Sequence, residues 1–455
     1  MKKLVSILVL MLLISFAVGC SNEAEGNVSE KDNDTTNESS EDQTKEEEKQ
    51  EEIAQDPTEI TLYFPVAVGG PITELINTMA DDFNAEQDAY IVNPIYTGSY
   101  GETMTKAQTA MRSGDQPHLT VLSSTELFAL LESDMIIALD DLIEESGGDD
   151  YLNDFYYGFL ENGQTEGSTY SIPFQRSTQI LFYNKEAFEA AGLDPETPPT
   201  TWDEIVEYGK LLTTDDQWGY EIPSTSFVAW LFQGLALQNG KNLMSSDGTE
   251  VYFDTPENVE ALEFWRDLAS VHGIMQDPVI DWATSPTSFL EGQTAMMVHT
   301  TGNLANIRDN ASFEFGTAYL PAGNRDHGTP VGGGSFYIFN GISEEEERGA
   351  WEFIKYATSP DVMAQWSIDT GYVGATESSY ETEIMKAYLE EFPQAATARD
   401  QLEHAHASIS TYHNAEIQQI LSDFVQAALL GEMTAEEALK AAQEQADQLL
   451  APYKQ

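Results

Sequence analysis

Segments with two different hydrophobic periods alternate along this chain, and this alternation restricts the fold more than any other feature. Ile60, Leu62 and Phe64 repeat at period two, which is typical of a strand with one buried face. A segment with apolar residues at helical spacing follows, and a second predicted strand, 90–96, again leads to a predicted helix. Strands that alternate with helices predict an α/β fold with mainly parallel sheets, covered by helices on both faces.

Further helix boundaries have local chemical signatures. Thr201 and Thr434 each precede a Glu by three residues, which predicts capping boxes at two helix starts. Pro256 and Pro360 follow Thr and Ser, the order expected for a proline at the first helical position. The C-terminal segment predicts two helices that are separated at Gly431.

The N-terminus predicts export. Lys2 and Lys3 precede an apolar stretch, 4–19, which is short for a membrane-spanning helix but has the length of a secretory signal, so 1–19 is a predicted signal peptide. Residues 17–20, Ala-Val-Gly-Cys, resemble the lipobox of bacterial lipoproteins, in which the Cys becomes the lipidated N-terminus. The alternative is a plain signal peptide followed by an incidental Cys. We expect Cys20 to be lipidated and to anchor the protein to the outer face of the cytoplasmic membrane.

An acidic segment follows, and we expect 20–57 to be a disordered tether. Residues 21–57 hold 14 Asp and Glu against three Lys and almost no large apolar side chain, so they cannot bury enough surface to fold. The whole chain of 455 residues has 78 acidic and 20 basic residues, a net charge of −58, which excludes a nucleic-acid binder. We interpret this acidity as solubility in a salty or alkaline exterior rather than as cation binding.

Common catalytic and nucleotide-binding motifs are absent. The sequence has no Gly-x-Ser-x-Gly, His-Glu-x-x-His, Walker or Gly-x-Gly-x-x-Gly motif, and its single Cys excludes a disulfide or Cys-based metal site. The glycine run 332–334 is followed by a predicted strand, 336–339, rather than by the helix of a phosphate loop. It therefore favours a hinge or a close backbone approach. Because the chain has so many acidic residues, the sequence leaves open the alternative of a glycoside hydrolase with paired catalytic carboxylates.

Four motifs resemble the solute-binding lipoproteins of ABC importers, the group that includes maltodextrin and glycerol-3-phosphate binders. They are Ser171–Lys185 (SIPFQRSTQILFYNK) with Gly192–Pro195 and Pro198–Trp202, Gly302–Arg308 with Leu320-Pro321, the glycine run that ends at Ser335, and Thr370-Gly371-Tyr372. The resemblance covers the chain from about Ile60 to the C-terminus and is strongest to the glycerol-3-phosphate branch.

This resemblance implies a two-lobe periplasmic-binding-protein fold with a ligand cleft between the lobes, which close by a hinge motion. Lobe 1 is expected at 58–174 plus 328–374, and lobe 2 at 175–327 plus 375–455. The implied function is the substrate-binding component of an ABC importer, a monomer that captures a small polar solute and delivers it to a membrane permease. Glycerol-3-phosphate, a glycerophosphodiester and a sugar are the expected solutes, and no cofactor is expected.

The resemblance also implies which residues line the cleft. Hydroxyl groups and a backbone N–H at these positions suit polyol or phosphate oxygens, and Tyr adds an apolar wall. The implied residues are Tyr100, Ser177, Thr300 or Thr301, Gly333 and Tyr372. Trp230 is a further candidate, as a platform against a sugar face, with ordinary helix core as the alternative.

Two departures from the branch bear on the solute. Ser123 stands where the branch has a ligand-contacting acid, and Ser410 aligns near its phosphate-binding Arg. Loss of that Arg would lower affinity for an anion by one to two decades, at about 1.5–3 kcal/mol for a charge-assisted hydrogen bond. Arg176 is the candidate compensating cation, with a surface salt bridge as its alternative.

Other functions remain as alternatives. His404, His406 and His413 could gather as metal ligands, but we expect them at the cleft edge or in solvent, so no metal site is predicted. A secreted carbohydrate-active enzyme with paired carboxylates is the main alternative to a binding protein. A purely structural surface lipoprotein is the third hypothesis, disfavoured because it needs no closing cleft.

Overall fold

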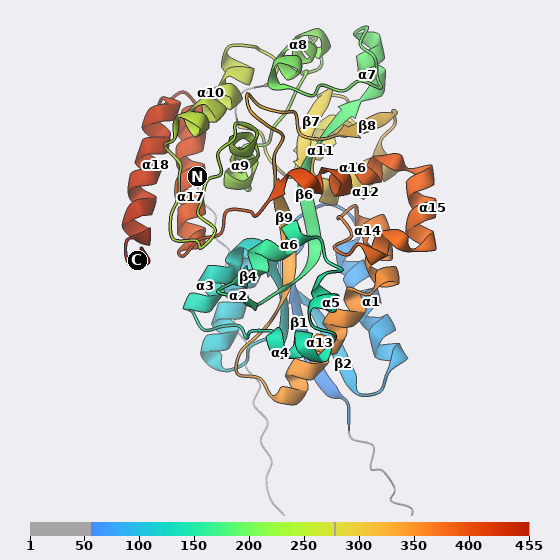
Figure 1. Ribbon diagram of the computed structural model, residues 1–455. Helices are drawn as coiled ribbons and strands as arrows, with labels where there is room; N and C mark the ends of the chain where they lie inside the picture. Colours follow the sequence, from blue (N-terminus) through green and yellow to red (C-terminus); the bar gives the residue numbers. More distant parts are fainter. Residues whose placement is uncertain (1–55, 277–278, 455) are drawn as a thin grey trace, which may run out of the picture. The chain divides into compact units, whose positions relative to one another are not determined.

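The computed structural model describes residues 56–276 and 279–454 (Figure 1). The predicted signal peptide 1–19, the predicted lipidation site Cys20 and nearly all of the predicted tether 20–57 lie outside the described residues. The strands are β1 (Thr58–Phe64), β2 (Tyr90–Tyr96), β3 (Leu119–Ser123), β4 (Gln164–Thr165), β5 (Ser168–Thr169), β6 (Ile172–Asn184), β7 (Met296–Thr300), β8 (Phe315–Ala318), β9 (Thr329–Ile338) and β10 (Ala405–His406).

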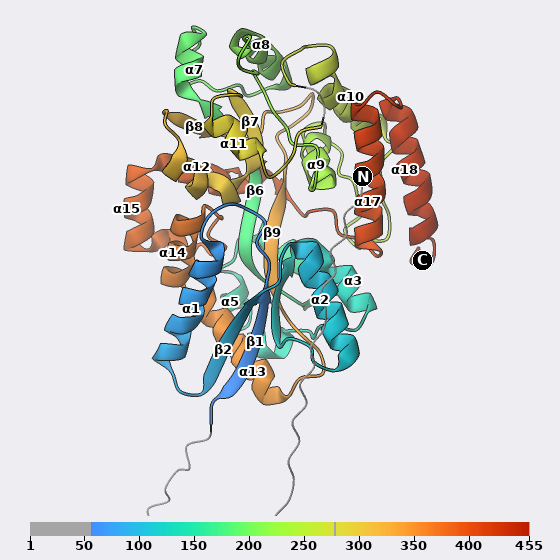
Figure 2. The same ribbon diagram turned by 180° about the vertical axis from the view of Figure 1, so that it is seen from behind.

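Helices cover the strands on both sides (Figure 1, Figure 2). They are α1 (Ile72–Glu86), α2 (Tyr100–Ser113), α3 (Leu127–Glu132), α4 (Asp140–Glu145), α5 (Asp149–Leu152), α6 (Tyr157–Leu160), α7 (Lys185–Ala190), α8 (Trp202–Leu212), α9 (Val228–Gln238), α10 (Pro256–Ser270), α11 (Ser285–Leu290), α12 (Leu304–Asn310), α13 (Glu344–Ala357), α14 (Pro360–Thr370), α15 (Glu383–Glu391), α16 (Thr397–Asp400), α17 (Asn414–Leu429) and α18 (Ala435–Leu450). Two 3₁₀ turns matter for the site, η1 (Ser124–Glu126) and η3 (Thr301–Asn303).

The hydrophobic periods predict the first elements correctly. In β1 the alternating residues Ile60, Leu62 and Phe64 are buried, and in α1 the residues at helical spacing face the core. The strand predicted at 90–96 is β2. The C-terminal segment forms α17 and α18, which end and begin on either side of Gly431 as predicted.

The main sheet is mixed. In the described part of the chain it has the order β2-β1-β3-β9-β6-β7, with β8 on β6 and β10 on β9. Pairing is parallel between β1 and its neighbours β2 and β3, but β9 pairs antiparallel with β3, and β6 pairs antiparallel with β7, β8 and β9. The expectation of mainly parallel pairing therefore holds at the β1 end and for the short pair of β10 with β9, but not around β6. Periodicity within a segment carries no information on the direction in which distant strands meet.

Two long strands, β6 and β9, run through the middle of the body and join two buried clusters (Figure 1). The first cluster combines β1 with α1, α13 and α14, and the second combines α8, α9, α10, α17 and α18. All 13 residues of β6 are buried, because neighbouring strands and helices cover both of its faces. Residues 55–455 make one compact unit, so the two lobe boundaries stay a prediction.

The predicted helix starts are found, with one difference. Thr434 caps α18 with a complete capping box, and Pro256 and Pro360 occupy first-turn positions of α10 and α14. Thr201 accepts from the Glu204 backbone N–H at 3.2 Å, but the Glu204 carboxylate accepts from the backbone N–H of Thr200 at 2.7 Å. The return half of this box is thus displaced by one residue, because the Thr200 backbone and hydroxyl both point toward Glu204.

The glycine run lies inside β9, as its sequence context predicted. Gly333 has φ +87°, and a Cβ there would lie 1.7 Å from the carbonyl oxygen of Gln175 on β6. Only a residue without a side chain permits this approach of the two central strands. The interpretation as a close backbone approach is confirmed.

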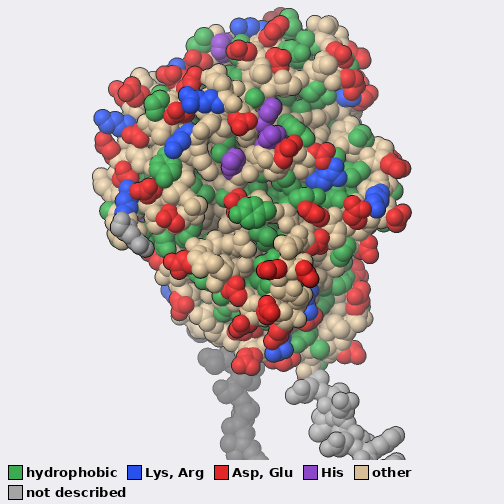
Figure 3. All heavy atoms as spheres, viewed as in Figure 1, with side chains coloured by type: hydrophobic (Ala, Val, Ile, Leu, Met, Phe, Trp, Pro, Cys, Tyr) green, Lys and Arg blue, Asp and Glu red, His purple; other side chains and the backbone are tan. Residues whose placement is uncertain are grey.

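Acidic side chains are scattered over the face in Figure 3 rather than gathered in one patch, with few basic ones between them. This distribution fits a solvated acidic surface. Within residues 56–276 and 279–454, no helix is both long enough and apolar enough to span a membrane.

Candidate functional site

A cavity of about 180 Å³ lies where the two buried clusters meet, with walls from both of them. Tyr372 belongs to the first cluster and Trp282 to the second, and both line it. A second cavity of about 620 Å³ continues it, since six residues line both: Ala67, Val68, Tyr100, Ser226, Phe227 and Trp282. Together they have the size of a small-molecule site.

Strand ends bring the polar residues to this cavity. Ala67 follows β1, Tyr100 follows β2 as the first residue of α2, and β3 ends at Ser123. The carboxyl ends of the parallel strands β1, β2 and β3 therefore open into it, the position where open α/β sheets bind ligands. From the other cluster, β7 ends at Thr300, and α9 contributes Trp230.

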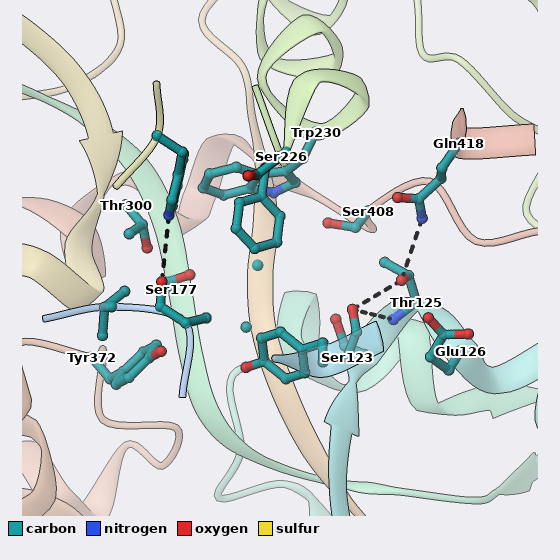
Figure 4. Close-up of a pocket in the computed structure, with 18 residues that line it drawn as sticks. Ser123, Thr125, Glu126, Ser177, Ser226, Trp230, Thr300, Tyr372, Ser408 and Gln418 are labelled. Carbon is teal, nitrogen blue, oxygen red and sulfur yellow. Dashed lines mark hydrogen bonds between the residues drawn. The ribbon is translucent and has the colours of Figure 1, made fainter. Parts of the chain in front are cut away.

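The central strands supply the floor. Ser177 on β6 and Gly333 on β9 both line the cavity; in the register of the two strands Ser177 pairs with Gly332, and Gly333 pairs with Arg176. Figure 4 shows two polar ends of the cavity: Ser177, Thr300 and Tyr372 at one, and Ser123, Thr125, Glu126 and Gln418 at the other.

Seven of the nine residues predicted to contact the solute line this one cavity. They are Tyr100, Ser123, Ser177, Trp230, Thr300, Gly333 and Tyr372. They come from seven different segments of the chain, and their common placement is a property of the tertiary structure. Their contact with a solute stays a prediction.

Thr301, offered as an alternative to Thr300, does not line the cavity. Its hydroxyl accepts from the backbone N–H of Thr178 at 3.2 Å, and the side chain is fully buried. Thr301 thus ties η3 to β6, while Thr300, the last residue of β7, faces the cavity.

Arg176 also lies elsewhere. Its side chain is completely buried, and its guanidinium carbon lies 5.1 Å from the ring centre of Phe159 on α6. Among the described residues it has neither a carboxylate partner nor a hydrogen-bond partner for its guanidinium nitrogens. Burial lowers the pKa of this guanidinium to about 10. Arg176 is not among the residues that line either cavity, although its charge acts on the phenol of Tyr100, which lines both. Its contact with a solute stays a prediction.

The aromatic walls are held in fixed orientations. Trp230 donates its indole N–H to the carbonyl of Val331 at 2.8 Å, so its ring stands against β9. The rings of Trp230 and Trp282 lie 6.2 Å apart at an angle of 72°, and Phe227 packs edge-on against Trp282 at 4.6 Å. Burial raises the pKa of the Tyr100 and Tyr372 phenols, so both keep their protons and can donate hydrogen bonds.

Among the described residues, Glu126 is the one charged side chain that lines either cavity. Burial raises the pKa of its carboxyl to about 7. The linings hold no Lys, Arg or His within the described ranges. The cavity therefore offers hydroxyl, amide and aromatic groups with a single weak acid.

Comparison with known proteins identifies the family. The family described as "Bacterial extracellular solute-binding protein" matches residues 78–394, well over half of the chain. The chain belongs to this family.

Relatives of the solute-binding protein agree with this assignment. It is 28% identical over 419 residues to the sn-glycerol-3-phosphate-binding periplasmic protein UgpB of Yersinia pseudotuberculosis, covering 88% of this chain and 93% of the relative. Its fold is similar to that of UgpB from Mycobacterium tuberculosis in complex with glycerophosphocholine, with a TM-score of 0.78, 26% identity, and coverage of 88% of this chain and 99% of the other. It is also similar to the cyclic alpha-maltosyl-1,6-maltose binding protein of Arthrobacter globiformis, with a TM-score of 0.75, 25% identity, and coverage of 87% and 100%.

The family and fold inferred from the sequence motifs are thus confirmed. The protein is the extracellular or periplasmic solute-binding component of an ABC transporter and delivers a small solute to the permease. The alternative of a carbohydrate-active enzyme is set aside, because this family binds solutes without transforming them.

Several lining residues of the solute-binding protein escaped the sequence analysis. They are Glu126, Ser226, Phe227, Trp282, Ser408 and Gln418. All but Gln418 lie in turns or loops, where hydrophobic periodicity gives no signal, and they meet only in the folded chain. Ser226 has φ +62°, an uncommon backbone conformation that only the structure reveals.

The residues that the sequence analysis considered for an anion or a metal site do not gather at the cavity. Ser410, aligned near the branch's phosphate-binding Arg, donates its hydroxyl to the carbonyl of Thr125 at 2.8 Å and does not line the main cavity. His404 lies beside His327, with 5.3 Å between ring centres, while His413 pairs with Glu416 at 3.0 Å. Over the described residues, no group of three or more His, Cys, Asp or Glu could hold a metal ion.

Proposed function

We propose that this protein captures an uncharged polyhydroxylated solute, a sugar or a polyol, for its ABC importer. The observation that carries the proposal is the cavity wall, which has hydroxyls and aromatic rings but, within the described residues, no Lys, Arg or His. Buried charges need a partner, so a wall without a cation is unfavourable for a doubly charged phosphate monoester. Glu126 adds repulsion to such an anion whenever it is ionised.

The cavity wall suits both the hydroxyl groups and the C–H surfaces of a neutral polyol. Hydroxyls of Ser177, Thr300, Tyr100 and Tyr372 can donate to and accept from sugar hydroxyls. The rings of Trp230 and the aromatic residues around it offer flat apolar surfaces to the C–H faces of a pyranose. Glu126, whose pKa is about 7, can take part as a neutral donor or as a charged acceptor.

A glycerophosphodiester is the second candidate. The relative from Mycobacterium tuberculosis was crystallised with glycerophosphocholine and is 26% identical to this chain. A diester carries one negative charge rather than two, and a quaternary ammonium group can interact with aromatic faces and with an ionised Glu126. Glycerol-3-phosphate itself, with no ammonium group, is the least compatible of the three predicted solutes.

We further infer two lobes, 58–174 plus 328–374 and 175–327 plus 375–455, which close over the solute. The second cluster lies within the second of these lobes, whereas the first cluster takes in residues of both, such as Ile180 and Phe315. The passage of β6 and β9 between the clusters and the tight contact at Gly333 support a hinge there. We also propose that lipidation of Cys20 holds the receptor at the membrane, close to the permease, and that 20–57 lets the folded body reach it.

The test is a thermal-shift series on the purified mature protein. Maltose, glucose, glycerol, glycerophosphocholine and glycerol-3-phosphate are each titrated, and calorimetry measures affinity and stoichiometry. A solute at 1,000 times its Kd stabilises the native state by about 4 kcal/mol, which shifts Tm by several degrees. A shift with a neutral sugar or polyol supports the proposal. A shift only with glycerophosphocholine selects the second candidate, and a shift only with glycerol-3-phosphate overturns both.

A further inference from the structure

Trp282 is the aromatic residue that spans the cavity from one buried cluster to the other. We propose that its indole N–H is a latch that holds the segment after β1 across the cavity, and that His299 is the positioning residue that sets this indole. The inference rests on the proposed capture of a solute between two closing lobes. It assigns the closing contact to named residues.

The contact joins the two sides directly. Trp282 belongs to the second buried cluster, and its Nε1–H donates to the carbonyl oxygen of Ala67 at 3.4 Å. Ala67 follows β1, and its neighbours Val66 and Val68 pack on the first cluster. Both partners line the smaller cavity and its wider continuation. A solute inside would thus be covered by this contact.

The segment after β1 also packs on its far side, since a Cβ placed on Gly302 of η3 would stand 3.3 Å from the Val68 side chain. The backbone N–H of Val66 donates to the carbonyl of Gly98 at 2.9 Å, a bond within the first cluster's side of the cavity. Gly69 lies near the side chain of Asn306, since a Cβ there would stand 3.6 Å from its amide. The Trp282 hydrogen bond is therefore a main polar link from this segment to the opposite wall.

His299 fixes the indole from behind. This residue of β7 is fully buried, and its ring stacks on Trp282 with 3.9 Å between ring centres and 32° between planes. Its Nε2 lies 3.2 Å from the Trp282 carbonyl oxygen, and its Nδ1 lies 2.9 Å from the amide nitrogen of Asn303. An amide N–H that donates to Nδ1 requires the neutral tautomer with the proton on Nε2, which then donates to Trp282.

The frame behind His299 is rigid. On β7 it pairs with Ile180 of β6, the strand that is buried along its whole length. Phe227 closes the other side of the indole edge-on at 4.6 Å, and the Trp282 backbone N–H donates to Thr225 at 3.0 Å. Ring contacts and the backbone hydrogen bond thus hold the indole in place, and its N–H can donate to the carbonyl of Ala67.

The first test needs no solute. Hydrogen exchange by mass spectrometry compares residues 65–71 in the purified wild-type protein, Trp282→Phe, His299→Leu and His299→Gln. Trp282→Phe keeps an aromatic ring but removes the N–H, and Trp218→Phe is the matched control, because Trp218 is 37% exposed and lines neither cavity. We expect exchange in this segment to rise about threefold or more in Trp282→Phe and His299→Leu. His299→Gln, whose amide can still donate, and the control should stay near wild type.

The second test uses solutes. Dissociation rates of maltose and glycerophosphocholine, as the probes, are measured by stopped flow, and Trp282→Phe should release a bound probe about three- to tenfold faster. Unchanged exchange in Trp282→Phe overturns the latch, whatever the probes do. If His299→Leu lowers Tm strongly, its exchange reports on loss of folding, and the result for Trp282→Phe alone tests the latch. If exchange rises in Trp282→Phe but neither probe binds to the wild-type protein, the result supports the latch and contradicts the proposed solute class.

Discussion

Arg176 and Ser177 are neighbours on β6, yet their side chains serve different surroundings: Ser177 lines the cavity, and Arg176 is buried against Phe159 at 5.1 Å. The alternation of a strand separates them, because successive side chains point to opposite faces. The motif that contains both residues therefore carries one position that faces the solute cavity and one that faces the protein interior.

Replacement of Ser177 by Ala should weaken solute binding. The hydroxyl lies on the cavity floor and its loss removes one hydrogen bond, worth about 0.5–1.5 kcal/mol, so the Kd should rise about two- to tenfold. Calorimetry with the sugar or diester identified in the thermal-shift series measures this change. An unchanged Kd would place the solute away from β6.

Replacement of Arg176 by Met should raise stability. The guanidinium is fully buried without a carboxylate or a hydrogen-bond partner among the described residues, and an apolar side chain of similar length removes that desolvation cost. We expect the free energy of unfolding in urea to rise by about 1–3 kcal/mol. A large loss of stability would mean that water or an ion partners the guanidinium. A loss of affinity for glycerophosphocholine at unchanged stability would restore Arg176 as a solute ligand.

Replacement of Gly333 by Ala should strongly destabilise the protein. The φ of +87° is unfavourable for Ala, and the added Cβ would lie 1.7 Å from the Gln175 carbonyl oxygen, so the substitution would force β6 and β9 apart. Gly192 is the matched control, with φ +79° and open space around its Cβ position. We expect Gly192→Ala to cost about 1–2 kcal/mol from backbone strain alone, and Gly333→Ala to cost several kcal/mol in urea unfolding. Equal costs would contradict the close approach.

Replacement of Glu221 by Gln should stabilise the protein increasingly as pH rises from 4.5 to 7, and fully above that range. This residue is 2% exposed, and burial raises the pKa of its carboxyl to about 7, against about 4.5 when it is exposed. The folded state holds the proton more tightly than the unfolded state, so the carboxyl reduces stability as pH rises from 4.5 to 7. We expect Glu221→Gln to gain about 1–3 kcal/mol at pH 8 and nothing at pH 4 in urea titrations. A gain that is the same at both pH values would show that the carboxyl does not titrate in this range.

The sequence predicted the secondary-structure elements and the family more completely than it predicted the site. Local signals predicted β1, β2, α17, α18 and the starts of α8, α10 and α14, because periodicity and capping depend on neighbours in the chain. The direction of strand pairing was mispredicted around β6, since no local signal reports it. Seven of the predicted site residues were found together because the family motifs mark the positions that face the cavity.

The sequence by itself determined an α/β chain of this family, with an acidic surface and a glycine where two central strands touch. Only the tertiary structure decided that Arg176 is buried, that Glu126 is the one charged group among the described residues at the cavity, and that Trp282 reaches across it to Ala67. The physical reason is that burial, orientation and electrostatic environment depend on atoms from distant segments. A spacing pattern reports only on near neighbours.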